Sequence, residues 1–166
     1  MRIGIDITCL KDLYANRGIG IYASELVHEL LKFDQHEFVL FGFDDLESNL
    51  FLLKSRPLPN INFVSLGKAK ASSPFNPVFF KTIFIRKIKQ AKLDIFFATH
   101  FERGLPIGKI KTAVIIQDII PYVTNKYSSK GAIVNFLKGR FYRNNLESAK
   151  KADLILTNSD FTFINK

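Results

Sequence analysis

The stretch Asn16-Arg17-Gly18-Ile19-Gly20-Ile21-Tyr22 joins a short apolar segment, Ile3 to Ile7, to a segment with helical periodicity from Ile19 to Phe33. The first segment has the composition of a buried β-strand, and the second repeats large apolar side chains at three- and four-residue spacing. We expect the core face of this helix to consist of Tyr22, Leu26, Leu30 and Phe33. A buried strand followed by an amphipathic helix is the first part of a βαβ unit, so the stretch predicts an α/β fold.

The two glycines of this junction permit the backbone to approach a ligand closely, and the first N–H groups of the helix favour an anion. Gly18-x-Gly20-x-x-Ala23 also has the spacing of a dinucleotide-binding fingerprint. That fingerprint needs its first glycine in the turn directly after the strand, whereas Thr8 to Arg17 intervene here. We therefore expect no NAD or FAD. A surface loop without a ligand is the alternative to an anion site.

The rest of the chain alternates strand and helix patterns, an order typical of a parallel sheet with right-handed crossovers. Further strands are predicted at His36–Gly42, Ile61–Leu66, Leu93–Ala98, Thr112–Ile116 and Asp153–Thr157, with an irregular loop from Thr99 to Lys111. Helices are predicted within Asp44–Asn60, from Asn76 to Ala91 with Phe80, Ile83, Phe84 and Ile88 in the core, from Ser128 or Ser129 to Lys150, and after a cap at Ser159. We expect a Rossmann-like, doubly wound, mainly parallel sheet of about six or seven strands flanked by helices.

The composition is that of a folded protein, because 47% of the 166 residues are apolar, and one domain is expected. The single cysteine, Cys9, is interpreted as a buried, inert thiol in a reducing compartment. The three histidines have no metal-ligand spacing, so no metal site is predicted. His28 and His36 are interpreted as structural, whereas His100 follows a strand and either contacts substrate or is structural as well. Asp6 is expected to order the loop after the first strand through backbone hydrogen bonds.

The formal net charge of +9 favours anionic partners, and the basic side chains cluster on two predicted helices. The outer side of the helix predicted at 76–91 mixes basic and apolar residues: Lys81, Lys89, Lys92, Val78 and Ile85. One hypothesis is that Lys81, Lys89 and Lys92 contact the anionic headgroups of a membrane. The alternatives are a solvated helix surface and a nucleic-acid interface. Nucleic acid is not expected, because the aromatic residues follow core periodicity and the chain has no recognition module.

Four sequence motifs lie at or near the ends of the predicted strands. They are Arg2-Ile3-Gly4-Ile5-Asp6, Arg17-Gly18-Ile19-Gly20-Ile21-Tyr22, Gln117-Asp118-Ile119-Ile120-Pro121 and Ala152-Asp153-Leu154-Ile155-Leu156-Thr157-Asn158-Ser159. In this order and spacing, the chain resembles the N-terminal domain of the bacterial group 1 (family 4) glycosyltransferases, over essentially all of its residues. Enzymes of that family have the GT-B fold, in which two Rossmann-like domains face each other across a cleft.

The resemblance implies the acceptor-side domain of a retaining glycosyltransferase that transfers a sugar from a nucleotide-diphosphate sugar to a glycan or lipid-linked acceptor of the bacterial cell envelope. It implies no cofactor and no metal. Gly18, Ile19 and Gly20 would lie next to the donor diphosphate, and Gln117 and Asp118 near the transferred sugar as catalytic residues. Acceptor contacts are assigned to Thr8, His100 and Asp118. The leaving phosphate helps to deprotonate the acceptor in this family, so no dedicated protein base is required.

Two residues depart from the family pattern. Gln117 stands where the family usually has histidine, and glutamine can hydrogen-bond a sugar hydroxyl but cannot carry a proton at neutral pH. Ile21 stands where arginine is common. The sequence stops at Lys166, just inside a predicted helix, so we expect residues 1–166 to be one N-terminal domain without its nucleotide-sugar-binding C-terminal domain. Such a chain is expected to be inactive alone and either cytoplasmic or peripherally bound to the inner face of the plasma membrane. The alternative is a non-catalytic basic α/β domain that binds nucleic acid or another polyanion.

Overall fold

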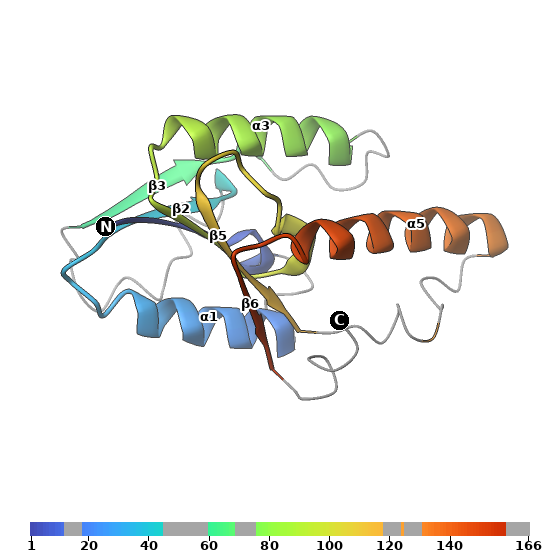
Figure 1. The fold of residues 1–166 in the computed structure, drawn as a ribbon, viewed down its shortest axis with the longest axis horizontal. Helices are drawn as coiled ribbons and strands as arrows, with labels where there is room; N and C mark the ends of the chain where they lie inside the picture. The colour runs from blue at the N-terminus through green and yellow to red at the C-terminus, as the bar shows by residue number, and fades with distance from the viewer. Residues whose placement is uncertain (12–17, 45–59, 69–75, 118–123, 125–130, 159–166) are drawn as a thin grey trace. The chain divides into compact units, whose positions relative to one another are not determined.

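The computed structural model describes residues 1–11, 18–44, 60–68, 76–117, 124 and 131–158 (Figure 1). Six strands hydrogen-bond in the order β3-β2-β1-β4-β5-β6, and the pairs β1–β2, β2–β3 and β5–β6 are parallel. This is the strand order of a Rossmann fold, which confirms the predicted α/β class. The chain divides into two compact units, Met1–Phe97 and Ala98–Lys166, and each is described separately below.

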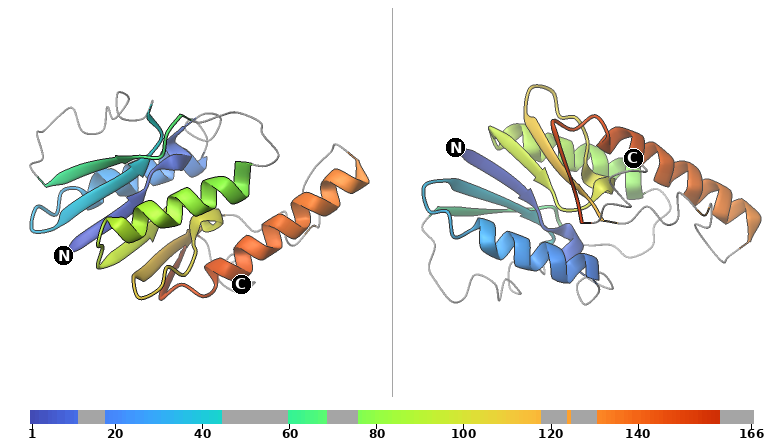
Figure 2. Two further views of the ribbon diagram at one scale, coloured as in Figure 1. Left: turned by 90° about the horizontal axis from the view of Figure 1, so that it is seen from above. Right: turned by 60° about the horizontal axis from the view of Figure 1, so that its bottom comes forward.

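The described residues of the first unit form four strands, two long helices and a short turn of 3-10 helix. These are β1 (Arg2–Asp6), η1 (Thr8–Leu10), α1 (Gly18–Leu30), β2 (Glu37–Gly42), β3 (Ile61–Ser65), α3 (Asn76–Gln90) and β4 (Ile95–Ala98), whose last residue belongs to the second unit. In the central register Ile5 lies beside Leu40, which lies beside Phe63. Helices α1 and α3 cover opposite faces of β1, β2 and β3 (Figures 1 and 2). The strands therefore have their side chains covered from both sides.

Three phenylalanines form the centre of this unit. The Phe84 ring of α3 meets the rings of Phe41 and Phe96 edge to face, with centroid distances of 6.1 and 5.7 Å, and Phe41 and Phe96 are 6.1 Å apart. Phe84 and Ile88 are fully buried, so the predicted core face of α3 is confirmed at these two positions. Ile83 is half-buried, and the Phe80 side chain lies outside the described residues.

The predicted core face of α1 is wrong. Tyr22 and Phe33 are exposed, and Leu26 and Leu30 are only half-buried. The buried face consists instead of Gly20, Ala23, Val27 and Leu31. Both stripes have helical spacing, and the smaller side chains allow the helix backbone to lie closer to the strands.

An aspartate aligns β1 with the chain before β4. The Arg2 N–H donates to the Asp94 carboxylate at 2.7 Å, and the Asp94 N–H donates to the Arg2 carbonyl at 2.9 Å. On the other side of the unit, Lys87 of α3 donates through its ammonium group to the carbonyl of Ser65 at the end of β3. These long-range bonds fix where the strands and α3 lie along the sheet.

The second unit contains η4 (Phe101–Arg103), β5 (Lys111–Ile116), α5 (Ala132–Ala149) and β6 (Leu154–Thr157). The segment 99–111, predicted to be irregular, includes η4 and an antiparallel bridge between Ile107 and Ile110. Its apolar side chains explain this order, because Phe101, Leu105 and Ile107 are buried. Gly104 permits close packing here, since a Cβ atom at this position would lie 2.5 Å from a methyl group of Val114.

Helix α5 begins later than predicted, at Ala132, with Gly131 as its N-cap at a φ of 97°. The predicted caps Ser128 and Ser129 lie outside the described residues, as do Ser159 and nearly all of the helix predicted within Asp44–Asn60. The C-terminal half of α5 is held in the core by Leu146 and Ala149, both fully buried. Its N-terminal half extends away from β5 and β6 (Figures 1 and 2).

A second aspartate aligns β5 with β6. The Asp153 carboxylate accepts hydrogen bonds from the Thr112 N–H at 2.8 Å and from the Lys111 ammonium at 2.7 Å. The Lys111 hydrogen bond, followed by that of Thr112, holds the pKa of Asp153 below its ordinary value of 3.8. The hydrogen bond and the negative charge of Asp153 raise the pKa of Lys111 above 10.5. Both groups are solvent-exposed, so the pair fixes alignment more than it adds stability.

Candidate functional site

The turn after β1 is ordered by a buried carboxylate. One Asp6 oxygen accepts a hydrogen bond from the Thr8 N–H at 2.9 Å, which confirms that Asp6 orders this segment. Thr8 opens η1 and is buried, and Cys9 beside it is buried as predicted. Helix η1 packs against α1 within the first unit. Thr8, predicted to contact the acceptor, therefore lies in a folded turn beside α1, the helix that begins with Gly18 and Gly20.

The glycine junction forms the first turn of α1. The helix starts at Gly18, so the N–H groups of Gly18, Ile19 and Gly20 belong to the turn whose amides have no partner within the helix. A Cβ atom at Gly18 would meet no atom of the described residues within 4 Å, whereas Gly20 is on the buried face. Gly18 thus offers open backbone, and Gly20 serves packing. Because β1 ends at Asp6, the first glycine does not occupy the tight turn of a dinucleotide fingerprint.

In the second unit, the chain that follows β4 lies beside the residue that follows β5. The Gln117 side chain donates through Nε2 to the Thr99 carbonyl at 3.4 Å, and Gln117 is only 8% exposed. This bond fixes the orientation of the Gln117 carboxamide. Thr99 was not anticipated from the sequence. The one sequence signal for it is a polar residue directly after an apolar strand.

His100 is oriented by its own turn. Its Nδ1 atom accepts a long hydrogen bond of 3.4 Å from the Glu102 N–H, and its ring lies 4.7 Å from the ring of Phe101. Phe101 is buried and packs in turn against Tyr142 of α5, with centroids 4.7 Å apart. The turn and the Phe101 ring therefore fix the orientation of the His100 ring, next in sequence to the Thr99 that Gln117 holds.

The structure thus brings together Gln117 and the Thr99–His100 segment in the second unit, and η1 with α1 in the first. Asp118, predicted to be catalytic and to bind the acceptor, lies outside the described residues. The described groups are neutral hydrogen-bonding side chains at strand ends, a set that can bind hydroxyl groups. No cluster of histidine, cysteine, aspartate and glutamate that could hold a metal ion occurs among the described residues.

The surface of α3 that was predicted to contact membrane carries Lys81, Lys89 and Lys92, all exposed. None of the three forms an ion pair with another residue in the described part of the chain. Ile85 is half-buried, and the side chain of Val78 is not among those described. This surface therefore presents charge with little apolar area. In the described ranges, no helix combines the length and apolar character needed to cross a bilayer.

Comparison with known proteins gives limited similarity. No family model matches the chain, and no curated protein matches its sequence. One solved structure that it resembles is a dTDP-glucose 4,6-dehydratase from Bacillus anthracis str. Ames in complex with NAD, with 16% sequence identity and a TM-score of 0.48. The match covers 95% of this chain and 53% of that one, so the chain spans about half the length of the dehydratase. A likeness this distant assigns no function.

Proposed function

We propose that this chain is the acceptor-side domain of a retaining glycosyltransferase that uses a nucleotide-diphosphate sugar and glycosylates a glycan or a lipid-linked acceptor. The observation that supports the proposal most directly is the neutral hydrogen-bonding group of Gln117 and His100 after parallel strands. Ligands of open α/β sheets bind outside the carboxyl ends of the strands. Neutral donors and acceptors suit sugar hydroxyl groups, which carry no charge to pair.

Each residue then has a specific task. The Gln117 carboxamide forms a hydrogen bond with a sugar hydroxyl, and His100 contacts the acceptor. The open backbone at Gly18 lies next to the donor diphosphate, where the first amides of α1 favour negative charge. Proton removal from the acceptor is assigned to the leaving phosphate, since glutamine cannot act as a base. Asp118 and Thr8 complete the proposed acceptor contacts.

The proposal places the protein at the inner face of the plasma membrane, where lipid-linked acceptors are found. Lys81 and Lys89 of α3 and Lys92 just after it are exposed and attract anionic headgroups, each by about 1 kcal/mol at the surface. A nucleotide-sugar donor, the acceptor and a C-terminal donor-binding domain are the proposed partners. No resident cofactor and no nucleic acid are included.

The test is transfer by the full-length protein with a panel of nucleotide-diphosphate sugars, measured as nucleotide release that depends on acceptor. Gln117→Ala should lower kcat/KM about tenfold, the loss of roughly one hydrogen bond. Gln117→His should keep activity and add a pH dependence near the imidazole pKa of about 6.5, which a merely structural role would not produce. Gln90→Ala, an exposed change on α3, is the matched control.

A second arm concerns the donor phosphate. Gly18→Val has open space and should raise the donor KM while the protein stays folded. Gly20→Val introduces bulk on the buried face of α1 and should also lower stability. An unchanged donor KM in folded Gly18→Val would remove the glycine turn from the site. Turnover by residues 1–166 alone would contradict the two-domain reaction, and nucleic-acid binding without any transfer would favour the non-catalytic alternative.

A further inference from the structure

Helix α5 carries a row of large apolar side chains on its solvent side. Ile133 is 77% exposed, Phe136 67%, Leu137 60% and Phe141 45%. Their spacing of three, four and eight residues from Ile133 places them on one side of a helix, and we call them the α5 ridge. The ridge belongs to the half of the helix that extends away from β5 and β6 (Figures 1 and 2). A contiguous exposed apolar surface of this kind marks a site of interaction.

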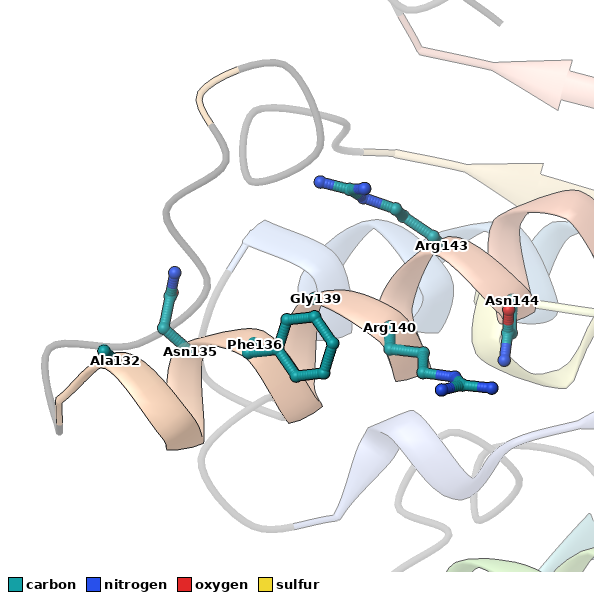
Figure 3. A pocket seen from close by; sticks show the side chains of 7 residues that line it. All are labelled: Ala132, Asn135, Phe136, Gly139, Arg140, Arg143 and Asn144. Atoms are coloured by element: carbon teal, nitrogen blue, oxygen red, sulfur yellow. The ribbon is translucent and has the colours of Figure 1, made fainter.

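The charged side chains that border the ridge are all basic. Lys138, Arg140 and Arg143 are exposed, and the sequence from 131 to 146 contains no acidic residue. Arg140 and Arg143 diverge from the helix on either side of its axis (Figure 3). They line a hollow of about 450 Å³ along the same helix, to which α5 contributes Ala132, Asn135, Phe136, Gly139, Arg140, Arg143 and Asn144. An occupant of this surface must therefore be both apolar and anionic.

Charge decides between the candidate occupants. A second copy of the chain would place the basic border of one ridge against that of the other without an acidic residue from 131 to 146 to pair with. A bilayer interface offers acyl chains to the ridge and phosphates to the long basic side chains on its border. We propose that the α5 ridge inserts into the interfacial layer of an anionic phospholipid membrane, with Lys138, Arg140 and Arg143 against the lipid phosphates.

This contact differs from the one proposed for α3 and does not depend on glycosyl transfer. Lys81, Lys89 and Lys92 provide a similar number of charges on α3, but the nearby Ile85 is half-buried. Helix α3 can therefore attract a membrane, whereas α5 can also enter it. The inference would hold for a protein of any activity, and its failure would leave the transferase proposal untouched.

The first experiment is co-sedimentation of residues 1–166 with vesicles of phosphatidylglycerol and phosphatidylcholine, and with vesicles of phosphatidylcholine alone. Binding should require phosphatidylglycerol. Phe136→Ser with Leu137→Ser should weaken it about tenfold or more, because two side chains lose apolar burial. Phe33→Ser, which removes an exposed apolar side chain from the first unit, is the matched control and should bind like wild type.

The charge arm compares the two helices directly. Lys138→Gln with Arg140→Gln should weaken binding about 25-fold, at about fivefold per charge. Lys81→Gln with Lys89→Gln removes the same net charge from α3 and should have the smaller effect. Weakened binding by the α3 pair, with wild-type binding by the α5 pair, would overturn the inference.

The second experiment uses the absence of tryptophan from the sequence. Phe136→Trp supplies a single fluorophore on the ridge, and its emission should shift to shorter wavelength and be quenched by brominated lipid when anionic vesicles are added. Phe33→Trp should show neither change. Quenching confined to Phe33→Trp, or binding to anionic vesicles without quenching of Phe136→Trp, would exclude insertion of α5.

Discussion

Helices α3 and α5 are both long, basic and adjacent to the parallel strands of their own units. Helix α3 directs its large apolar side chains toward the core, whereas the N-terminal half of α5 directs them toward solvent. In α3 the large apolar side chains Phe84 and Ile88 are buried, and the lysines are outside. In α5 the large apolar side chains of the N-terminal half are outside, and the first fully buried large apolar side chain is that of Leu146. The difference shows that apolar content alone does not reveal whether a helix supports the fold or offers a surface. Substitutions can separate the two uses.

The largest effect is expected from truncating the aromatic centre. Phe84→Ala should lower the free energy of unfolding by about 3–5 kcal/mol, because the ring is 1% exposed and packs against Phe41 and Phe96. Phe136→Ala on α5 should change it by less than about 0.5 kcal/mol. Urea denaturation followed by circular dichroism measures both. Equal losses would mean that α5 is also packed through its ridge.

A second pair tests the contrast within α5 itself. Leu146→Ala removes a fully buried side chain and should lower the free energy of unfolding by about 2–5 kcal/mol. Leu137→Ala removes the same atoms from an exposed position and should be nearly neutral. Urea denaturation followed by circular dichroism measures the free energy of unfolding of both variants. A neutral Leu146→Ala would contradict the buried C-terminal half of the helix.

The helix ends provide a smaller, opposite-signed comparison. Lys92, just after α3, has a φ of 51°, a left-handed conformation that glycine adopts without strain. Lys92→Gly should raise the free energy of unfolding by about 0.5–1 kcal/mol. Lys150, which caps α5, has a φ of −60°, so Lys150→Gly should lower it by about the same amount. Both changes remove one lysine, so net charge is matched. Shifts of the same sign would point to charge instead of backbone conformation.

The smallest effect concerns the Lys111–Asp153 pair. The pKa of Asp153 is lowered in the fold, so its contribution is present above about pH 4 and is lost as pH falls through the folded value. The pKa of Lys111 is raised, so its contribution is present below about pH 10 and is lost as pH rises further. The stability difference between wild type and Asp153→Asn should therefore be small and constant near neutrality, absent at low pH, and reduced at high pH to the part that the Thr112 hydrogen bond supplies. Thermal melts across pH measure it, and the difference between wild type and Lys111→Gln should be absent at both extremes. A difference that persists at pH 2 would assign the effect to something other than ionisation.

The sequence alone is sufficient to predict the strands, because each is a short apolar run between polar or glycine-containing turns, as in Glu37–Gly42. The sequence does not predict the core face of α1. Tyr22 has a larger apolar surface than Ala23, but the smaller Ala23 is the residue that packs against the strands. Periodicity identifies a helix without choosing between neighbouring stripes. For the same reason, no core face of α5 was predicted.

The sequence predicted which residues follow the strands and lie near a ligand. It did not predict which of these residues contact one another. Residues after parallel strands were expected near a ligand, and Gln117 and His100 do follow β5 and β4. The bond from Gln117 to Thr99 depends on how two strands align, which no local pattern contains. The roles of Asp94 and Asp153 were missed for this reason, since each binds an amide far away in the sequence.

Asp94 and Asp153 each stand directly before a strand and receive the backbone N–H of a residue from another strand. Parallel strands are joined by long crossovers, and a crossover cannot enforce which residues pair in the way a hairpin turn does. A slip by one residue would move the partner amide by about 3.3 Å and leave the carboxylate without it. The two aspartates, one in each unit, thus favour the native register over a sheet whose strands have slipped by one residue.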